Sequence, residues 1–128
     1  EPDATLVLWD TFQSGRVLFL PKSNRPDDSV ELLGTPDLVV EVVSDSSVRK
    51  DLVLLLDGYL RAGIPEYWVV DARGAELRFE IFRLWGGAWT AAAPVGQPQP
   101  SAVLGMTVTL SRTRNRVGRW SYTLSVVG

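Results

Sequence analysis

The sequence contains no cysteine and no histidine among its 128 residues. Without cysteine the chain has neither disulfide bonds nor a thiolate metal site, which is typical of a reducing compartment and leads us to expect a cytoplasmic protein. Without histidine it lacks the usual general base and the commonest zinc ligand, so serine–histidine and cysteine–histidine mechanisms are excluded within this chain. Any chemistry must depend on carboxylates, lysine, tyrosine, hydroxyl groups or an oxygen-ligated ion.

Lysines and long apolar runs are also scarce. Lys22 and Lys50 are the only lysines. No apolar run approaches the ~20 residues that a membrane span needs, and no basic-then-apolar leader opens the chain, so we expect no membrane partner. With a net charge of −2, the molecule as a whole does not attract nucleic acid, although local basic patches are possible. The length fits a single domain over residues 1–128.

The stretch from Thr35 to Asp71 predicts a strand, a helix and a second strand. Its strands are expected over residues 37–43 and 66–71, because both runs are apolar and rich in valine. The helix is expected from about Val48 to Ala62, with Gly63 as its left-handed cap. A strand, helix and strand joined this tightly suggest a right-handed crossover between parallel strands.

The rest of the chain predicts mainly strands and turns. The expected fold class is α/β: a mixed β-sheet with a flanking helix and C-terminal β-hairpins. Because the chain enters a strand almost at once, we expect that an N-terminal part of the domain is missing from this sequence. The expected strands are Thr5–Trp9, Arg16–Leu20, Glu76–Leu84 with a hairpin through Trp89, Met106–Leu110 and Arg119–Val126. The expected loops are Pro21–Asp28, Ala93–Ser101 and the basic turn Arg112–Arg116.

One acidic residue interrupts the first apolar strand. Glu41 lies in the run Leu38–Val43, where a buried carboxylate costs several kcal/mol unless a partner, a metal or water compensates it. Asp3 and Asp37 each follow a proline and each begin a strand. The three carboxylates could form an oxygen-rich site of the kind that Mg²⁺ or Mn²⁺ prefers. Alternatively, the two aspartates cap strand starts and Glu41 pairs with a buried arginine.

The stretch from Thr35 to Asp71 resembles the Uma2 family, formerly DUF820. The family is placed among the PD-(D/E)XK restriction-endonuclease-like nucleases. The resemblance implies a mixed sheet flanked by helices, a domain core over residues 1–84, a C-terminal hairpin region over residues 85–128, and metal-dependent cleavage of DNA phosphodiesters. It rests on the runs Pro36–Ser44, Arg49–Asp51 and Ala62–Asp71, together with Tyr59.

The resemblance also implies a set of site residues. Asp3 would be the first strand aspartate and Glu41 the acid of the (D/E)XK element, both ligands to Mg²⁺ or Mn²⁺. Asp37, at the mouth of the same strand, would be structural. The lysine expected two residues after the acid is Val43 in this chain.

Many family members instead supply that lysine from the following helix. The corresponding position in this chain is Leu55. Lys50, one turn earlier, is the nearest candidate to orient water or stabilise the leaving charge. Its alternative is a solvated lysine in the first helical turn, where the helix dipole gives a cation no stabilisation.

Several functions stay open at this stage. The chain is either a Mg²⁺- or Mn²⁺-dependent endonuclease acting on DNA, or a catalytically degenerate nuclease fold that serves as a binding or dimerisation module, with a homodimer as one form. An interaction protein that uses exposed aromatic hairpins is a third interpretation. The arginines from Arg112 to Arg119 either contact phosphate or form a solvated turn. The aromatic side chains predicted to pack in the core and hairpins are Tyr67, Trp68, Trp85, Trp89 and Trp120.

Overall fold

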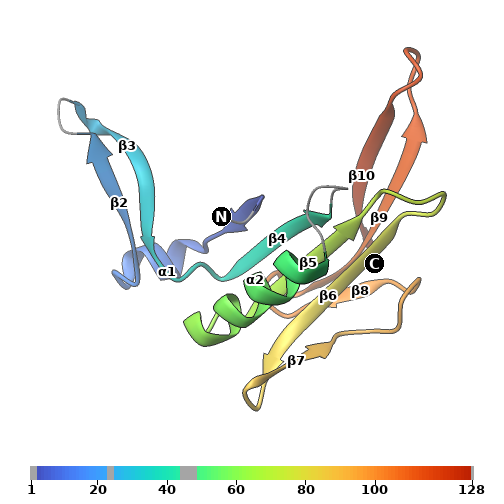
Figure 1. The fold of residues 1–128 in the computed structure, drawn as a ribbon. Helices are drawn as coiled ribbons and strands as arrows, with labels where there is room; N and C mark the ends of the chain where they lie inside the picture. Colours follow the sequence, from blue (N-terminus) through green and yellow to red (C-terminus); the bar gives the residue numbers. More distant parts are fainter. Residues whose placement is uncertain (1–2, 23–24, 44–48, 128) are drawn as a thin grey trace.

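The computed structural model describes residues 3–22, 25–43 and 49–127 and, within them, all side chains except those of residues 19–22, 25–32 and 49–54. These residues form mostly β structure with two short helices (Figure 1). The main sheet has five strands in the order β1-β4-β5-β6-β7. Only β4 and β5 are parallel, so the sheet is mixed, as predicted. The five strands are β1 (Ala4–Leu6), β4 (Leu38–Val43), β5 (Glu66–Asp71), β6 (Arg78–Trp85) and β7 (Ala88–Ala91).

The helix α2 (Arg49–Ala62) connects the two parallel strands and covers one face of the sheet (Figure 1). Leu56 and Tyr59 of α2 pack against Val39 and Tyr67 of the sheet. Gly63 ends the helix with a φ of 73°, a conformation that glycine adopts without steric cost. The predicted strand, helix and strand are therefore confirmed within the described residues. Neither helix in this part of the chain is long and apolar enough to cross a membrane.

A second, three-stranded sheet lies on the opposite face of the main sheet. Val108 packs there against Leu38, Trp68 and Ile81, so β4 and β5 are covered by apolar layers on both sides. The predicted C-terminal hairpin is confirmed, but its turn is shorter than predicted, and the predicted loop before it contains a short strand. The strands of this sheet are β8 (Gln99–Ser101), β9 (Met106–Arg114) and β10 (Trp120–Val127).

The N-terminal segment differs most from the prediction. Trp9 belongs to the helix α1 (Trp9–Gln13), not to the strand before it. The expected loop over residues 21–28 is also wrong, because β2 (Val17–Lys22) and β3 (Arg25–Gly34) form a hairpin that projects from the main sheet (Figure 1). Proline and clustered charges are typical of loops, but a projecting hairpin has few ladder and burial constraints. Its register shifts on both sides of Pro21.

The aromatic side chains divide between core and surface. Tyr67 and Trp68 are buried as predicted, and the Trp89 indole donates a hydrogen bond to the Leu56 carbonyl at 3.1 Å. Trp85 is 79% exposed beside the β6–β7 turn, so the packing predicted for it is wrong. Trp120 is 40% exposed, so its predicted packing is incomplete. Trp85 alternates with apolar neighbours but stands at the end of its strand, where nothing needs to cover it.

Candidate metal site

Asp3 and Glu41 lie opposite each other on neighbouring strands. β1 and β4 pair antiparallel with Ala4 opposite Val40, and the same register continued by one residue places Asp3 opposite Glu41. Opposed residues of an antiparallel pair project from the same face of a sheet. Asp3 is fixed there because its Oδ2 accepts a hydrogen bond from the Val42 backbone N–H at 2.7 Å. The structure therefore brings together the two residues that the sequence proposes as metal ligands.

The surroundings of Glu41 disfavour its charge. Glu41 is only 6% exposed, and its Oε1 accepts a hydrogen bond from the Tyr59 hydroxyl. Burial raises the pKa of Glu41; the Tyr59 hydrogen bond lowers this pKa in part, and the nearby Asp3 raises it again. The net pKa is above the ordinary value. A buried carboxylate beside a second carboxylate calls for a cation or a proton.

A second tyrosine lies close to the pair. Tyr67 is fully buried, and its hydroxyl has no hydrogen-bond partner among the described residues. Its ring centroid is 6.0 Å from that of Tyr59. Burial raises the pKa of Tyr67, and the charge of Glu41 raises it further. Buried polar groups are rarely left unpaired, and each exception asks for an explanation such as a bound water or ion. The phenol of Tyr67 is therefore a hydrogen-bond donor available beside Glu41.

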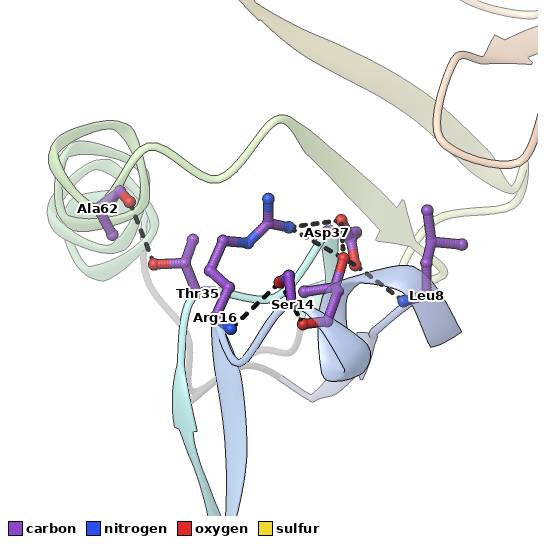
Figure 2. A network of polar contacts seen from close by, with 7 residues as sticks. Leu8, Ser14, Arg16, Thr35, Asp37 and Ala62 are labelled. Atoms are coloured by element: carbon purple, nitrogen blue, oxygen red, sulfur yellow. Dashed lines mark hydrogen bonds and ion pairs between the residues drawn. The ribbon is translucent and has the colours of Figure 1, made fainter.

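Asp37 belongs to a separate network that is structural (Figure 2). Its carboxylate accepts hydrogen bonds from the Arg16 guanidinium at 2.7 Å, the Leu8 backbone N–H at 2.8 Å and the Thr11 hydroxyl at 2.8 and 3.0 Å. These contacts tie α1 and the start of β2 to the residue before β4. They fit the structural role expected for Asp37. They also show that the buried carboxylate that pairs with an arginine is Asp37, whereas no arginine contacts Glu41 within the described part of the chain.

Neither of the two positions expected to supply a lysine has a cationic side chain. Val43 ends β4, and Leu55 is a partly buried residue of α2. Lys50 lies in the first turn of α2, but its side chain is outside the described residues. The α2 side chain that reaches Glu41 is Tyr59, one turn after Leu55. Sequence reasoning missed this role, because it used Tyr59 as part of the family resemblance and gave its hydroxyl no role. The signal that could have found it is the polar hydroxyl at helical spacing from the expected lysine position.

Glu66 shows how a structural carboxylate is compensated elsewhere in the chain. It is 1% exposed, and its oxygens accept hydrogen bonds from the Trp68 indole at 2.8 Å and the Ser101 hydroxyl at 2.6 Å. The backbone N–H groups of Ala102 and Val103 donate two more, at 2.9 and 3.3 Å. These four donors compensate the buried charge of Glu66 without a ligand. By comparison, Tyr59 is the donor that the described residues offer to Glu41.

The donor set of the pair fits a hard divalent cation. Mg²⁺ is usually held by one or two carboxylates, with water and substrate phosphate oxygens completing its octahedral shell. Asp3 and Glu41 supply such a pair, and a cation between them would offset their mutual repulsion. Within the described ranges, no group of three or more acidic, histidine or cysteine side chains is arranged to hold a metal. The pair therefore suits an ion that shares its shell with water and substrate, not a closed structural site.

The cavity beside Tyr59 does not contribute further ligands. It has a volume of about 250 Å³ and includes Tyr59 in its wall. The rest of the wall is mainly aliphatic, including Val17, Val39 and Ile64. Carbon-lined space of this kind does not coordinate a hard cation. The site is therefore defined by the two carboxylates on the α2 face of the sheet and not by this cavity.

Comparison with known sequences yields one family. The sequence model of the Uma2 family, described as "Putative restriction endonuclease", matches residues 1–113. The match includes β1, β4, α2 and β5, which carry the residues of the candidate site, and extends almost to the end of β9. A search among curated proteins finds no match for this chain.

Proposed function

Because the chain belongs to the Uma2 family, we propose that it is a metal-dependent DNA endonuclease of the restriction-endonuclease-like type. It hydrolyses phosphodiester bonds with Mg²⁺ or Mn²⁺, in the cytoplasm. The observation that carries this proposal is the placement of Asp3 opposite Glu41 on neighbouring strands. A buried carboxylate beside a second carboxylate is costly for folding alone, and such costs are typical of functional sites.

Each residue of the site has a proposed role. Asp3 and Glu41 would hold the cation, and Tyr59 fixes the orientation of Glu41 by donating a hydrogen bond to Oε1. The Tyr67 hydroxyl would donate a hydrogen bond to a buried water beside Glu41. Lys50 is the proposed cationic assistant. When bound, the ion would lower the pKa of a water molecule and stabilise negative charge on the phosphodiester.

The alternative is a catalytically degenerate nuclease fold that acts as a binding or dimerisation module. Val43 and Leu55 favour it, because both positions expected to supply the lysine carry aliphatic side chains. In this alternative the Asp3–Glu41 pair is a remnant that no longer supports turnover. The two functions differ in whether DNA is cleaved when the metal is present.

Plasmid cleavage separates these functions. Supercoiled DNA would be incubated with the wild type, Asp3→Asn and Glu41→Gln, in Mn²⁺ and in Mg²⁺, with Glu76→Gln as a control that removes an exposed carboxylate. We expect cleavage by the wild type and the control and a loss of more than about 100-fold in each site variant, because even outer-shell partners of metals contribute up to that amount. Equal cleavage by all four proteins would contradict the site assignment. No cleavage by wild type that binds the metal would favour the binding module.

A further inference from the structure

The charges of the chain are distributed unevenly along its length. Residues 81–128 contain five arginines and no acidic residue, whereas residues 1–80 contain fifteen acidic and eight basic residues. Asp3 and Glu41 lie in the acidic part. A polyanion that approaches them is repelled by that part of the chain, so its binding requires positive charge from elsewhere. Four of the five arginines are concentrated at the tip of the β9–β10 hairpin, at positions 112, 114, 116 and 119.

The tip of this hairpin, here called the arginine arm (residues 112–120), is built around Trp120. Arg114 pairs with Trp120 across the two strands, and Arg112 lies two residues earlier on the same face of β9. The two guanidinium carbons lie 4.3 Å (Arg112) and 4.1 Å (Arg114) from the centroid of the Trp120 ring. This cation–π packing holds two positive charges close together without neutralising them.

Arg112 fixes the arm relative to the main sheet. Its guanidinium donates hydrogen bonds to the backbone carbonyls of Ala72 at 3.1 Å, Gly74 at 2.9 Å and Ala75 at 3.1 Å. These carbonyls belong to the turn that follows β5, next to the end of β4 at which Glu41 lies. The arm extends past this end of the sheet (Figure 1). The arm is therefore placed near the end of the parallel strands toward which Glu41 lies, although its sheet packs on the face opposite α2.

The remaining three arginines keep their charge available. Arg114, Arg116 and Arg119 are exposed, and among the described residues none of the three forms an ion pair. Arg114 donates one hydrogen bond, to the Gly118 carbonyl at 2.6 Å, which leaves its other donors open. The turn between them is held by Asn115, whose side chain accepts hydrogen bonds from the backbone N–H groups of Val117 and Arg119, each at 3.0 Å. The charges are thus presented by an ordered turn.

We propose that the arginine arm binds the phosphate backbone of duplex DNA, with Arg114, Arg116 and Arg119 as the phosphate contacts and Arg112 as the anchor. This inference rests on the proposed function, because it names the surface that brings the substrate to the acidic site. Guanidinium groups match phosphate oxygens with paired donors, and a two-stranded ribbon is narrow enough to lie along a DNA groove. The Arg114–Trp120 contact holds one arginine in place at the hairpin tip.

The test is duplex binding without metal, so that it does not depend on catalysis. A fluorescent duplex would be titrated in EDTA with the wild type, Arg116→Gln, Arg119→Gln and the double variant, and followed by anisotropy over a range of salt concentrations. Arg61→Gln is the matched control, because Arg61 is an exposed arginine on α2, paired with Asp57 at 3.0 Å. Each lost phosphate contact should weaken binding about eightfold near 0.1 M salt and lower the salt slope by about 0.9.

The double variant should therefore bind roughly sixtyfold more weakly, with a salt slope lower by about 1.8. Arg61→Gln should stay within about twofold of the wild type. An unchanged affinity and slope in the double variant, or a wild type that does not bind duplex in low salt, would overturn the arm as a DNA surface. Because EDTA removes divalent ions, the measured affinity does not depend on a metal at Asp3 and Glu41. A failure of the metal site alone would thus leave this result intact.

Discussion

At the scale of single residues, three carboxylates that are buried in the described part of the chain show three ways to compensate a buried charge. Asp37 pairs with Arg16, and Glu66 accepts four hydrogen bonds. Glu41 receives the Tyr59 hydroxyl and has Asp3 beside it. A charge that the fold itself does not compensate is the one that a ligand must compensate. This contrast separates Glu41 from the two structural carboxylates.

The first prediction concerns Glu41 and pH. Because the pKa of Glu41 is raised in the folded protein, its ionisation costs stability once the pH exceeds the ordinary value. Without metal, Glu41→Gln should therefore unfold at higher urea concentration than the wild type at pH 8. The gain should vanish as the pH falls below about 4, where the glutamic acid is protonated in both states. Urea unfolding in EDTA at the two pH values measures it, and a variant less stable at pH 8 would contradict it.

Removal of the Glu66 carboxylate should lower the stability of the protein, in contrast to Glu41→Gln. Glu66→Ala leaves four donors without their acceptor, and two of them, the Trp68 indole and the Ser101 hydroxyl, are buried. The free energy of unfolding should fall by roughly 3 to 5 kcal/mol, because each unpaired buried group costs about 1 to 3 kcal/mol and some relax toward water. Urea unfolding checks this against Glu76→Ala, which removes an exposed carboxylate and should change stability by less than about 0.5 kcal/mol. Equal effects of the two substitutions would show that Glu66 is not a structural clamp.

Part of the site could be predicted from the sequence. Glu41 stands out because a carboxylate in an apolar strand needs a reason, and Asp3 follows from the motif and from the start of its strand. The role of Tyr59 was not predicted, because its spacing in α2 is that of a core residue; the one signal for it is a hydroxyl at helical spacing from Leu55. The Tyr67 hydroxyl, which has no hydrogen-bond partner among the described residues, is positioned by tertiary packing between β5 and α2. Sequence spacing does not encode this packing.

At the scale of elements, predictability follows the strength of the local pattern. The apolar run of β4, the cap at Gly63 and the run of β5 each fix an element, and these elements are found at nearly the predicted bounds. The strand β2 was predicted as far as Leu20, but β3 was missed because its first half is polar and contains a proline. The hairpin forms two paired strands outside the main layers, where alternation is not required.

Alanine substitutions at Gly34 and Gly58 should change stability in opposite directions, because an added Cβ is crowded at Gly34 and unobstructed at Gly58. Gly34 ends β3 with a φ of 125°, and a Cβ there would lie 2.1 Å from the Arg16 carbonyl oxygen. Gly34→Ala should destabilise the join between the hairpin and the sheet by at least about 2 kcal/mol. Gly58 lies in α2 with nothing within 4 Å of an added Cβ, so Gly58→Ala should stabilise the protein by about 0.5 to 1 kcal/mol. Thermal unfolding of both variants tests the two signs, and a neutral Gly34→Ala would contradict the close approach.

At the scale of the whole molecule, three layers position the site. The helix α2 covers one face of the main sheet and brings Tyr59 to Glu41, while the second sheet covers the other face. The presence of C-terminal strands could be predicted, but their packing behind the main sheet could not. That packing depends on Val108 and on the clamp at Glu66, two contacts between residues far apart in the chain. The mixed sheet was correctly predicted, whereas the molecule contains more β structure than an α/β fold suggests.

The measurement that tests the central claim most directly is calorimetric titration of Mn²⁺ into the metal-free protein. Wild type, Asp3→Asn and Glu41→Ala would be compared, with Glu76→Gln as the control for removing a carboxylate elsewhere. We predict Mn²⁺ binding by the wild type and the control, and a loss of affinity of more than about tenfold in each site variant. Binding that is unchanged in both Asp3→Asn and Glu41→Ala, or absent from the wild type, would contradict a metal site formed by this pair.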